Sequence, residues 1–344
     1  MTEDLVARLL DGDHRALARA ISTVENRRPG YRDLVSELHG YAGEGDVIGV
    51  TGSPGAGKST LVDKLAAAYR DRGLTVGIIA IDPASPFTGG AVLGDRIRMG
   101  SNVGDMDVFV RSMSARGSLG GLSTATADAV TALDAFGKDK ILIETVGAGQ
   151  NEIDIVKTAD TVAVLVPPGS GDDVQMLKAG ILEIADVFVV NKADVEGADR
   201  TVQQLREMLE YGRDAGPRDT GHHGPEALAD GATTEAAADE DEWRPPIVET
   251  VATRGEGVET FVDALDDHRA YLDESGRLAA VERTRYAEQI RTLLREDAGE
   301  LLEDEIDRRG GLDTFVERVR SRETDPYTVA DELIGPLRDC LDPD

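Results

Sequence analysis

The sequence contains very little cysteine, and it has no long apolar run. Its one cysteine, Cys340, cannot form an intrachain disulfide, and a zinc site built from several cysteines is excluded with it. No stretch approaches the ~18 consecutive apolar residues of a transmembrane helix, which excludes a membrane channel or transporter. The amino terminus lacks a basic region followed by an apolar stretch and a cleavage site, so we expect a cytoplasmic protein.

Positive charge is also scarce. The chain has 37 Lys and Arg against 66 Asp and Glu, a formal net charge of -29, and seven of the basic residues are lysines. Nucleic acid is not an expected partner, because phosphate backbones bind basic surfaces. Acidic excess with few lysines resembles adaptation to high salt, where the Debye length falls to ~3 Å at 1 M and carboxylate repulsion is screened. The alternative interpretation of this composition is an acidic mesophilic protein that is not adapted to high salt.

The apolar pattern predicts an α/β fold. Residues 1–44 have apolar positions at helical spacing, which favours a small helical amino-terminal domain. Short apolar runs that alternate with helical stretches follow, and they predict a mostly parallel, doubly wound sheet. The expected strands are Val47–Val50, Thr75–Ile81, Val108–Val110, Ile141–Ile143, Val162–Val166, Val187–Val190 and Ile247–Val251.

Two further regions differ in composition from this central domain, which we place at residues 45–273. Residues 212–244 have almost no large apolar side chain and read as a mobile acidic insertion. Residues 274–344 predict a charged helical extension with breaks at Gly310-Gly311 and Asp325-Pro326. A helical arm too polar to form a large core commonly packs on a partner or on a second copy.

A phosphate-binding loop follows the first expected strand. Its backbone N–H groups would surround the phosphates, Lys58 would reach the β- and γ-phosphates, and the Ser59 hydroxyl would ligate Mg²⁺. The match to G-x-x-x-x-G-K-[ST] consists of Gly52, Ser53, Pro54, Gly55, Ala56, Gly57, Lys58, Ser59 and Thr60.

A second motif predicts recognition of guanine. Asn191-Lys192-Ala193-Asp194 ends an expected strand, and the Asp194 carboxylate can accept hydrogen bonds from N1–H and the exocyclic amine of guanine. Near the last strand, Val251 and Ala252 lie where such folds place a loop whose backbone touches the guanine oxygen; an ordinary strand end is the alternative.

Acidic residues at strand ends are candidate magnesium and switch residues. Glu144, followed by Gly147, stands where GTPases usually carry D-x-x-G, so we expect it to hold Mg²⁺ or its waters while the Gly147 N–H senses the γ-phosphate. Asp82 and Asp95 could also face the metal, although a helix cap or a turn would explain both. Ala148 replaces the usual glutamine after the glycine, which predicts slow basal hydrolysis that depends on a partner.

These motifs together resemble the methylmalonyl-CoA mutase-associated GTPases, the MeaB and ArgK type within the G3E class of P-loop GTPases. The resemblance spans nearly the whole chain and rests on the following segments: residues 52–60, 81–85, 88–90, 93–96, 144–147 with Gln150, 168–173 with Gln175 and Lys178, 191–194 and 325–327.

The resemblance implies a GTP-hydrolysing chaperone of an adenosylcobalamin-dependent acyl-CoA mutase, with GTP as substrate and Mg²⁺ as cofactor. It implies magnesium and switch roles for Asp82, Asp95 and Glu144, so the catalytic set would be Lys58, Asp95, Glu144 and Gly147. It assigns residues 168–178 to a loop that couples the nucleotide state to the mutase. It also implies a homodimer through the carboxy-terminal arm.

Three other functions remain open. A nickel- or cobalt-insertion GTPase would need clustered His or Cys, whereas the adjacent His222 and His223 lie in the expected insertion with no cysteine nearby. A P-loop kinase would need a base near an acceptor hydroxyl, and nothing in the sequence identifies an acceptor site. A regulatory dimer that binds GTP without appreciable turnover is a third possibility, because the usual glutamine is missing.

Overall fold

The computed structural model describes residues 2–82, 105–114, 124–145, 155, 158–169, 184–214 and 243–341. The chain divides into two compact units, Met1–Glu288 and Gln289–Asp344, and each is described by itself. Asp95, Gly147 and residues 170–178 lie outside the described residues. The same holds for residues 215–242, which are most of the expected insertion.

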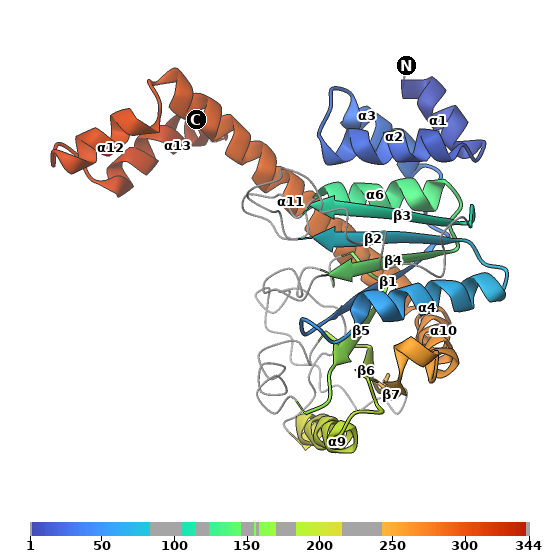
Figure 1. Ribbon diagram of the computed structural model, residues 1–344. Coiled ribbons are helices and arrows are strands. Elements are labelled where there is room, and N and C mark those ends of the chain that lie inside the picture. The colour runs from blue at the N-terminus through green and yellow to red at the C-terminus, as the bar shows by residue number, and fades with distance from the viewer. Residues whose placement is uncertain are drawn as a thin grey trace. The chain divides into compact units, whose positions relative to one another are not determined.

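The described part of the first unit is built on a parallel sheet of seven strands, in the order β3-β2-β4-β1-β5-β6-β7 (Figure 1). The α/β fold and all seven expected strands are confirmed. The strands are β1 (Asp46–Gly52), β2 (Val76–Asp82), β3 (Val108–Ser114), β4 (Lys140–Thr145), β5 (Thr161–Val166), β6 (Val187–Asn191) and β7 (Ile247–Thr250).

Helices cover both faces of the sheet, which explains why the strands are continuous apolar runs. Every residue of β1, β4, β5 and β6 is buried. One face packs against α4 (Lys58–Asp71) and α10 (Val258–Glu274), and the other against α6 (Thr124–Ala135) and α9 (Ala198–Asp214) (Figure 1). Because all strands are parallel, their carboxyl ends meet at one edge.

The first 44 residues form three helices that pack on α6. They are α1 (Thr2–Leu10), α2 (His14–Glu25) and α3 (Tyr31–His39). The Asp13 carboxylate caps α2, because its Oδ1 accepts from the backbone N–H of Arg15 at 2.8 Å. Buried Leu17 and Ile21 of α2 belong to the same apolar core as the sheet residues beneath α6. The amino-terminal helices therefore form an outer layer on that face.

The opposite edge of the sheet, at the amino ends of β1, β4 and β5, holds a buried charge network. Lys140 Nζ donates to Asp46 at 2.8 Å, and Arg285 of α11 (Arg277–Arg308) donates to Asp160 at 2.7 Å. Arg269 of α10 lies 3.6 Å from Asp46 and 3.7 Å from Asp160. Burial raises the pKa of Asp160 to about 6, against the attraction of Arg285. These ion pairs tie α10 and the start of α11 to the sheet.

The second unit contains the rest of α11, then α12 (Leu312–Arg320) and α13 (Pro326–Leu341). The expected breaks are confirmed: Gly310 and Gly311 have φ angles of +103° and +82°, and the Asp325 carboxylate caps α13 by accepting from Thr328 N at 3.1 Å. The buried core described here is small, namely Phe315, Val329 and Leu333. Across the residues described in both units, none of the helices has the length and apolarity needed to cross a membrane.

Candidate nucleotide-binding site

Two glycines of the phosphate-binding loop are required by its geometry. Gly52 ends β1 with φ +131°, and a Cβ built there would stand 2.1 Å from the Leu165 carbonyl oxygen of β5. Gly57 has φ +94°, and its Cβ would stand 2.4 Å from Asn191 Nδ2. Both contacts are closer than any side chain tolerates, and both φ values are costly for an L-residue. The loop can therefore pack against β5 and β6 without displacing their atoms only with glycine at these positions.

The loop delivers an uncapped helix start and a buried lysine. Gly57 is the N-cap of α4 and offers no side-chain acceptor, so the first N–H groups of the helix can face an anion. Lys58 is 6% exposed, and its Nζ donates to the carbonyl oxygens of Gly52 at 2.5 Å and Ser53 at 3.0 Å. These bonds hold the ammonium group inside the loop, where the phosphates of a nucleotide would lie.

Ser59 and Glu144 are brought together from two elements. The parallel register pairs Val50 of β1 with Glu144 of β4, and the next residues along, Thr51 and Thr145, share a hydrogen bond of 2.8 Å between their hydroxyls. Glu144 therefore lies beside the loop that leaves β1, and the Ser59 hydroxyl donates to Glu144 Oε1 at 2.5 Å.

This pair fits magnesium by its chemistry, because a hydroxyl and a carboxylate are the hard oxygen ligands that Mg²⁺ prefers. Glu144 is 7% exposed, so its charge is held in a largely enclosed position. Asp82 ends β2 at the same edge, but its side chain is not among those described, and Asp95 and Gly147 are outside the described residues altogether. In the described ranges, no group of three or more His, Cys, Asp or Glu side chains is arranged to hold a metal ion.

Asn191 connects three loops at this edge. Its Nδ2 donates to the Ala56 carbonyl of the phosphate-binding loop at 2.8 Å. Its Oδ1 accepts from the Thr250 hydroxyl and from the Ala252 backbone N–H, each at 3.1 Å. Asn191 is 2% exposed, so all these bonds are made away from water. A structural role for this residue follows: it fixes the loops after β1, β6 and β7 relative to one another.

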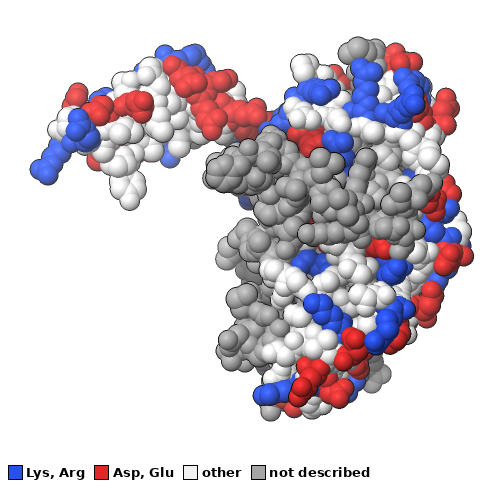
Figure 2. All heavy atoms as spheres, viewed as in Figure 1, with Lys and Arg blue, Asp and Glu red and all other residues white. Residues whose placement is uncertain are grey.

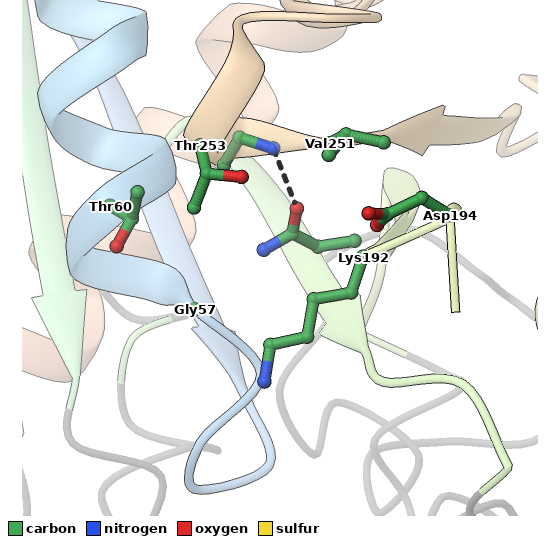
Figure 3. Close-up of a pocket in the computed structure, with 8 residues that line it drawn as sticks. Gly57, Thr60, Lys192, Asp194, Val251 and Thr253 are labelled. Atoms are coloured by element: carbon green, nitrogen blue, oxygen red, sulfur yellow. Dashed lines mark hydrogen bonds between the residues drawn. The ribbon is translucent and has the colours of Figure 1, made fainter.

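A pocket opens between these loops (Figure 3). Gly57 and Thr60 come from the start of α4, Lys192 and Asp194 from the loop after β6, and Val251 with its neighbours from the loop after β7. Lys192 extends toward the phosphate-binding loop and donates to the Gly55 carbonyl at 2.8 Å. The lining residues are Gly57, Thr60, Asn191, Lys192, Asp194, Val251, Ala252 and Thr253.

The sequence motifs did not point to Arg254. Arg254 ends the short 3-10 helix η5 (Ala252–Arg254), and its Nη1 lies 3.2 Å from Asp194 Oδ2. Its Nε also donates to Glu256 at 2.7 Å, and this carboxylate raises the pKa of Arg254. Arg254 thus holds the carboxylate that guanine recognition would use. Its position directly after the loop that contains Val251 and Ala252 was the one available signal.

The structure brings most of the predicted site residues to one edge of the sheet. Residues 52–60, Glu144, Asn191, Lys192, Asp194, Val251 and Ala252 all lie in loops or strand ends at the carboxyl edge. This arrangement combines an anion-binding helix start, two oxygen ligands and a pocket with a carboxylate at its wall. It is suited to a nucleoside phosphate and a divalent cation.

Comparison with known proteins agrees with this arrangement. A family model described as "Methylmalonyl Co-A mutase-associated GTPase MeaB" matches residues 17–306. A protein of Pyrococcus abyssi that is described as a GTPase is 47% identical over 337 residues, which are 98% of this chain and 97% of that protein. The mouse protein "Methylmalonic aciduria type A homolog, mitochondrial" is 29% identical, over 96% of this chain and 78% of its own length.

Among solved structures, one described as "LAO/AO transport system kinase" is similar in fold along its whole length. It is 25% identical, has a TM-score of 0.66, and the match covers 98% of this chain and 97% of that chain. The family match covers most of the sequence, including the phosphate-binding loop, Glu144, Asn191 and Asp194. The chain therefore belongs to the MeaB family of methylmalonyl-CoA mutase-associated GTPases.

Proposed function

We propose that this GTPase serves as the chaperone of an adenosylcobalamin-dependent acyl-CoA mutase of the methylmalonyl-CoA mutase type. Its GTP cycle would gate delivery of the cofactor and protect or reactivate the mutase. The family description names methylmalonyl-CoA mutase, and the name of the mouse relative refers to methylmalonic aciduria. The observation that carries the nucleotide part is the meeting of Ser59, Glu144 and Asn191 at one sheet edge.

In this proposal the guanine base lies in the pocket beside Asp194. Its carboxylate accepts from N1–H and the exocyclic amine of guanine, a pair of donors that adenine does not present. Arg254 forms an ion pair with this carboxylate, and Asn191 links the loop after β6 to the loop after β7. The backbone of Val251 and Ala252 faces the guanine oxygen. Selectivity for GTP over ATP follows from this arrangement.

The phosphates in this proposal lie along the loop and the start of α4. Lys58 exchanges its bonds to the Gly52 and Ser53 carbonyls for phosphate oxygens, which compensates for its burial. Ser59 and Glu144 would hold Mg²⁺, which would supply positive charge beside the β- and γ-phosphates. Asp82 and Asp95 complete the metal site, and the Gly147 N–H senses the γ-phosphate.

We also propose that the protein is a homodimer through its carboxy-terminal arm. Three large apolar side chains of α11 are exposed by half or more: Ile290 (58%), Leu294 (63%) and Leu301 (56%). Their spacing of four and seven residues puts them on one face of the helix. The second unit has only a small described core of its own, so a second copy that covers this stripe would supply the burial it lacks.

The dimer is tested by light scattering during size exclusion in high KCl. The wild type should have twice the monomer mass, and the variant Ile290→Glu/Leu294→Glu should elute as a folded monomer. A monomeric wild type, or a variant that remains dimeric, would contradict a dimer through this stripe.

The chaperone role is tested by the loss of mutase activity with time. The cobalamin-dependent acyl-CoA mutase of the same organism is assayed during turnover, alone and with this protein plus GTP. We expect GTP and wild-type protein to slow inactivation or to restore activity when adenosylcobalamin is supplied. The variant Glu144→Gln should fail to do so. Inactivation at the same rate in every mixture would rule out this client.

A further inference from the structure

Helix α2 and the turn after it carry a concentration of positive charge in an acidic chain. Residues 14–32 contain five arginines and a single carboxylate, Glu25, whereas the whole chain has a net charge of -29. Glu25 is already paired, because it accepts a hydrogen bond from Arg111 of β3. Figure 2 shows basic side chains over the amino-terminal helices, with acidic side chains beside them. The segment 14–32 is therefore net positive, although Asp11, Asp13 and Asp33 flank it.

Three of these arginines have side chains that are exposed and unpaired with the rest of the described chain. They are Arg15, Arg19 and Arg28. Arg15 and Arg19 are one helical turn apart on α2, so they point to the same side of the helix. Arg28 lies in the turn between α2 and α3. In a chain with so many carboxylates, unpaired guanidinium groups leave hydrogen-bond donors available to a partner.

The end of α2 is fixed to the middle of β3 and to the start of α6. Arg27 Nη2 donates to the hydroxyl of Thr124, the first residue of α6, at 3.2 Å. Together with the bond between Arg111 and Glu25, this contact holds the turn near the edge at which the nucleotide site is built. A partner bound on this turn would therefore lie on the side of the sheet where the strands end.

The backbone of Arg27 is strained in the turn that follows α2. Arg27 has φ +45° in the turn that ends α2, closed by hydrogen bonds from Arg27 N to Val24 O at 3.1 Å and from Arg28 N to Thr23 O at 3.0 Å. Helix ends of this type favour glycine, because an L-residue in the left-handed region is strained. Arg27 has this backbone cost, whereas the neighbouring Arg28 does not have a positive φ.

We infer that Arg15, Arg19 and Arg28 form the docking surface for an acidic face of the mutase, an inference that rests on the proposed client. Arginine pairs with carboxylates through two parallel hydrogen bonds, and it is enriched at protein interfaces. Long-range attraction is screened at molar salt, but such close pairs persist when water is excluded from them. The surface thus supplies carboxylate recognition separate from the nucleotide site.

The test compares two charge-matched triple variants in their binding to the purified mutase. The first is Arg15→Glu/Arg19→Glu/Arg28→Glu. The control is Arg200→Glu/Arg206→Glu/Arg244→Glu, three arginines that are exposed and have no ion pair in the described part of the chain. Both variants change the net charge equally. Melting temperature and basal GTP hydrolysis establish that each variant is folded, and the mutase Kd is measured by calorimetry at one KCl concentration.

We expect the first variant to bind the mutase at least about tenfold more weakly than the wild type, with the control unchanged. Equal binding by the first variant and the wild type would overturn the inference and leave the proposed client standing. Equal weakening in both variants would also overturn it, because net charge rather than this surface would then set affinity. If the wild type itself does not bind the mutase, both the proposed client and this docking surface are rejected.

Discussion

The substitution Gly57→Ala tests the packing between the phosphate-binding loop and Asn191. The new Cβ would stand 2.4 Å from Asn191 Nδ2, so the amide must move by about 1 Å to reach ordinary contact. Alanine at φ +94° costs about 1–2 kcal/mol, and weakening the buried hydrogen bonds of Asn191 costs about 1 kcal/mol for each bond. We expect a loss of about 3 kcal/mol in the free energy of unfolding.

The matched control is Gly55→Ala in the same loop. Gly55 has φ +76°, but a Cβ there meets nothing within 4 Å, so only the backbone cost of about 1 kcal/mol applies. Urea unfolding of the nucleotide-free protein at fixed KCl can follow Trp243. It is the single tryptophan and packs against His268 of the same unit, with ring centroids 4.7 Å apart.

A double-mutant cycle isolates the contact itself. With Asn191→Ala as background, the clash is gone, and Gly57→Ala should cost only the backbone term. We expect a coupling energy of about 1–2 kcal/mol between positions 57 and 191. Equal effects of Gly55→Ala and Gly57→Ala, or additivity within about 0.5 kcal/mol, would refute the reasoning.

Four further predictions follow from the site and from the charge of the chain. Glu144→Gln removes the charge of a proposed magnesium ligand, so the Mg²⁺ concentration for half-maximal GTP hydrolysis should rise at least about tenfold in a metal titration. An unchanged Mg²⁺ requirement would contradict a role for Glu144 in binding the metal. Arg254→Ala releases the Asp194 carboxylate and should weaken GDP binding several-fold in calorimetry, and Arg254→Lys should have an intermediate effect. Equal GDP affinity in wild type and variant would show that Arg254 does not contribute to nucleotide binding. Burial raises the pKa of Asp160 from 3.8 to about 6, so the folded state holds the proton more tightly than the unfolded state. The stability that the folded state gains from this tighter proton binding is fully present below about pH 3.8. It is lost as the pH rises through 6, and the loss in the free energy of unfolding is on the order of 3 kcal/mol. Asp160→Asn should therefore gain stability relative to the wild type between pH 4 and pH 8 in urea unfolding, and a constant difference would contradict the shifted pKa. Finally, because the net charge is -29, the melting temperature should rise with KCl up to molar concentrations. A melting temperature that stays constant or falls with KCl would contradict the predicted adaptation to high salt.

The strands could be predicted because helices bury both faces of the sheet, so each strand is a continuous apolar run, such as Val187–Val190 within β6. The helix breaks at Gly310-Gly311 and Asp325-Pro326 could also be predicted, because glycine and a capping aspartate end or begin a helix through local backbone geometry. The motif residues could be named because the spacing of a phosphate-binding loop reflects its chemistry.

The long-range contacts could not be predicted from local pattern. Apolar runs do not specify that β1 lies between β4 and β5, and this order is what brings Glu144 next to Ser59. Asp46 and Asp160 are far apart in the sequence and would be expected on the surface, yet both are buried beside arginine and lysine partners. The ion pair of Arg254 could not be predicted either, because its partner Asp194 is 60 residues away in the sequence.

GTP hydrolysis measured with and without the mutase tests the central claim most directly. The purified protein is assayed in high-KCl buffer with Mg²⁺, with ATP in parallel and with nickel as a further addition. We expect slow GTP turnover that rises sharply when the mutase is added, and no comparable turnover of ATP. Turnover that ignores the mutase but responds to nickel, or transfer of phosphate from ATP to an acceptor, would contradict it.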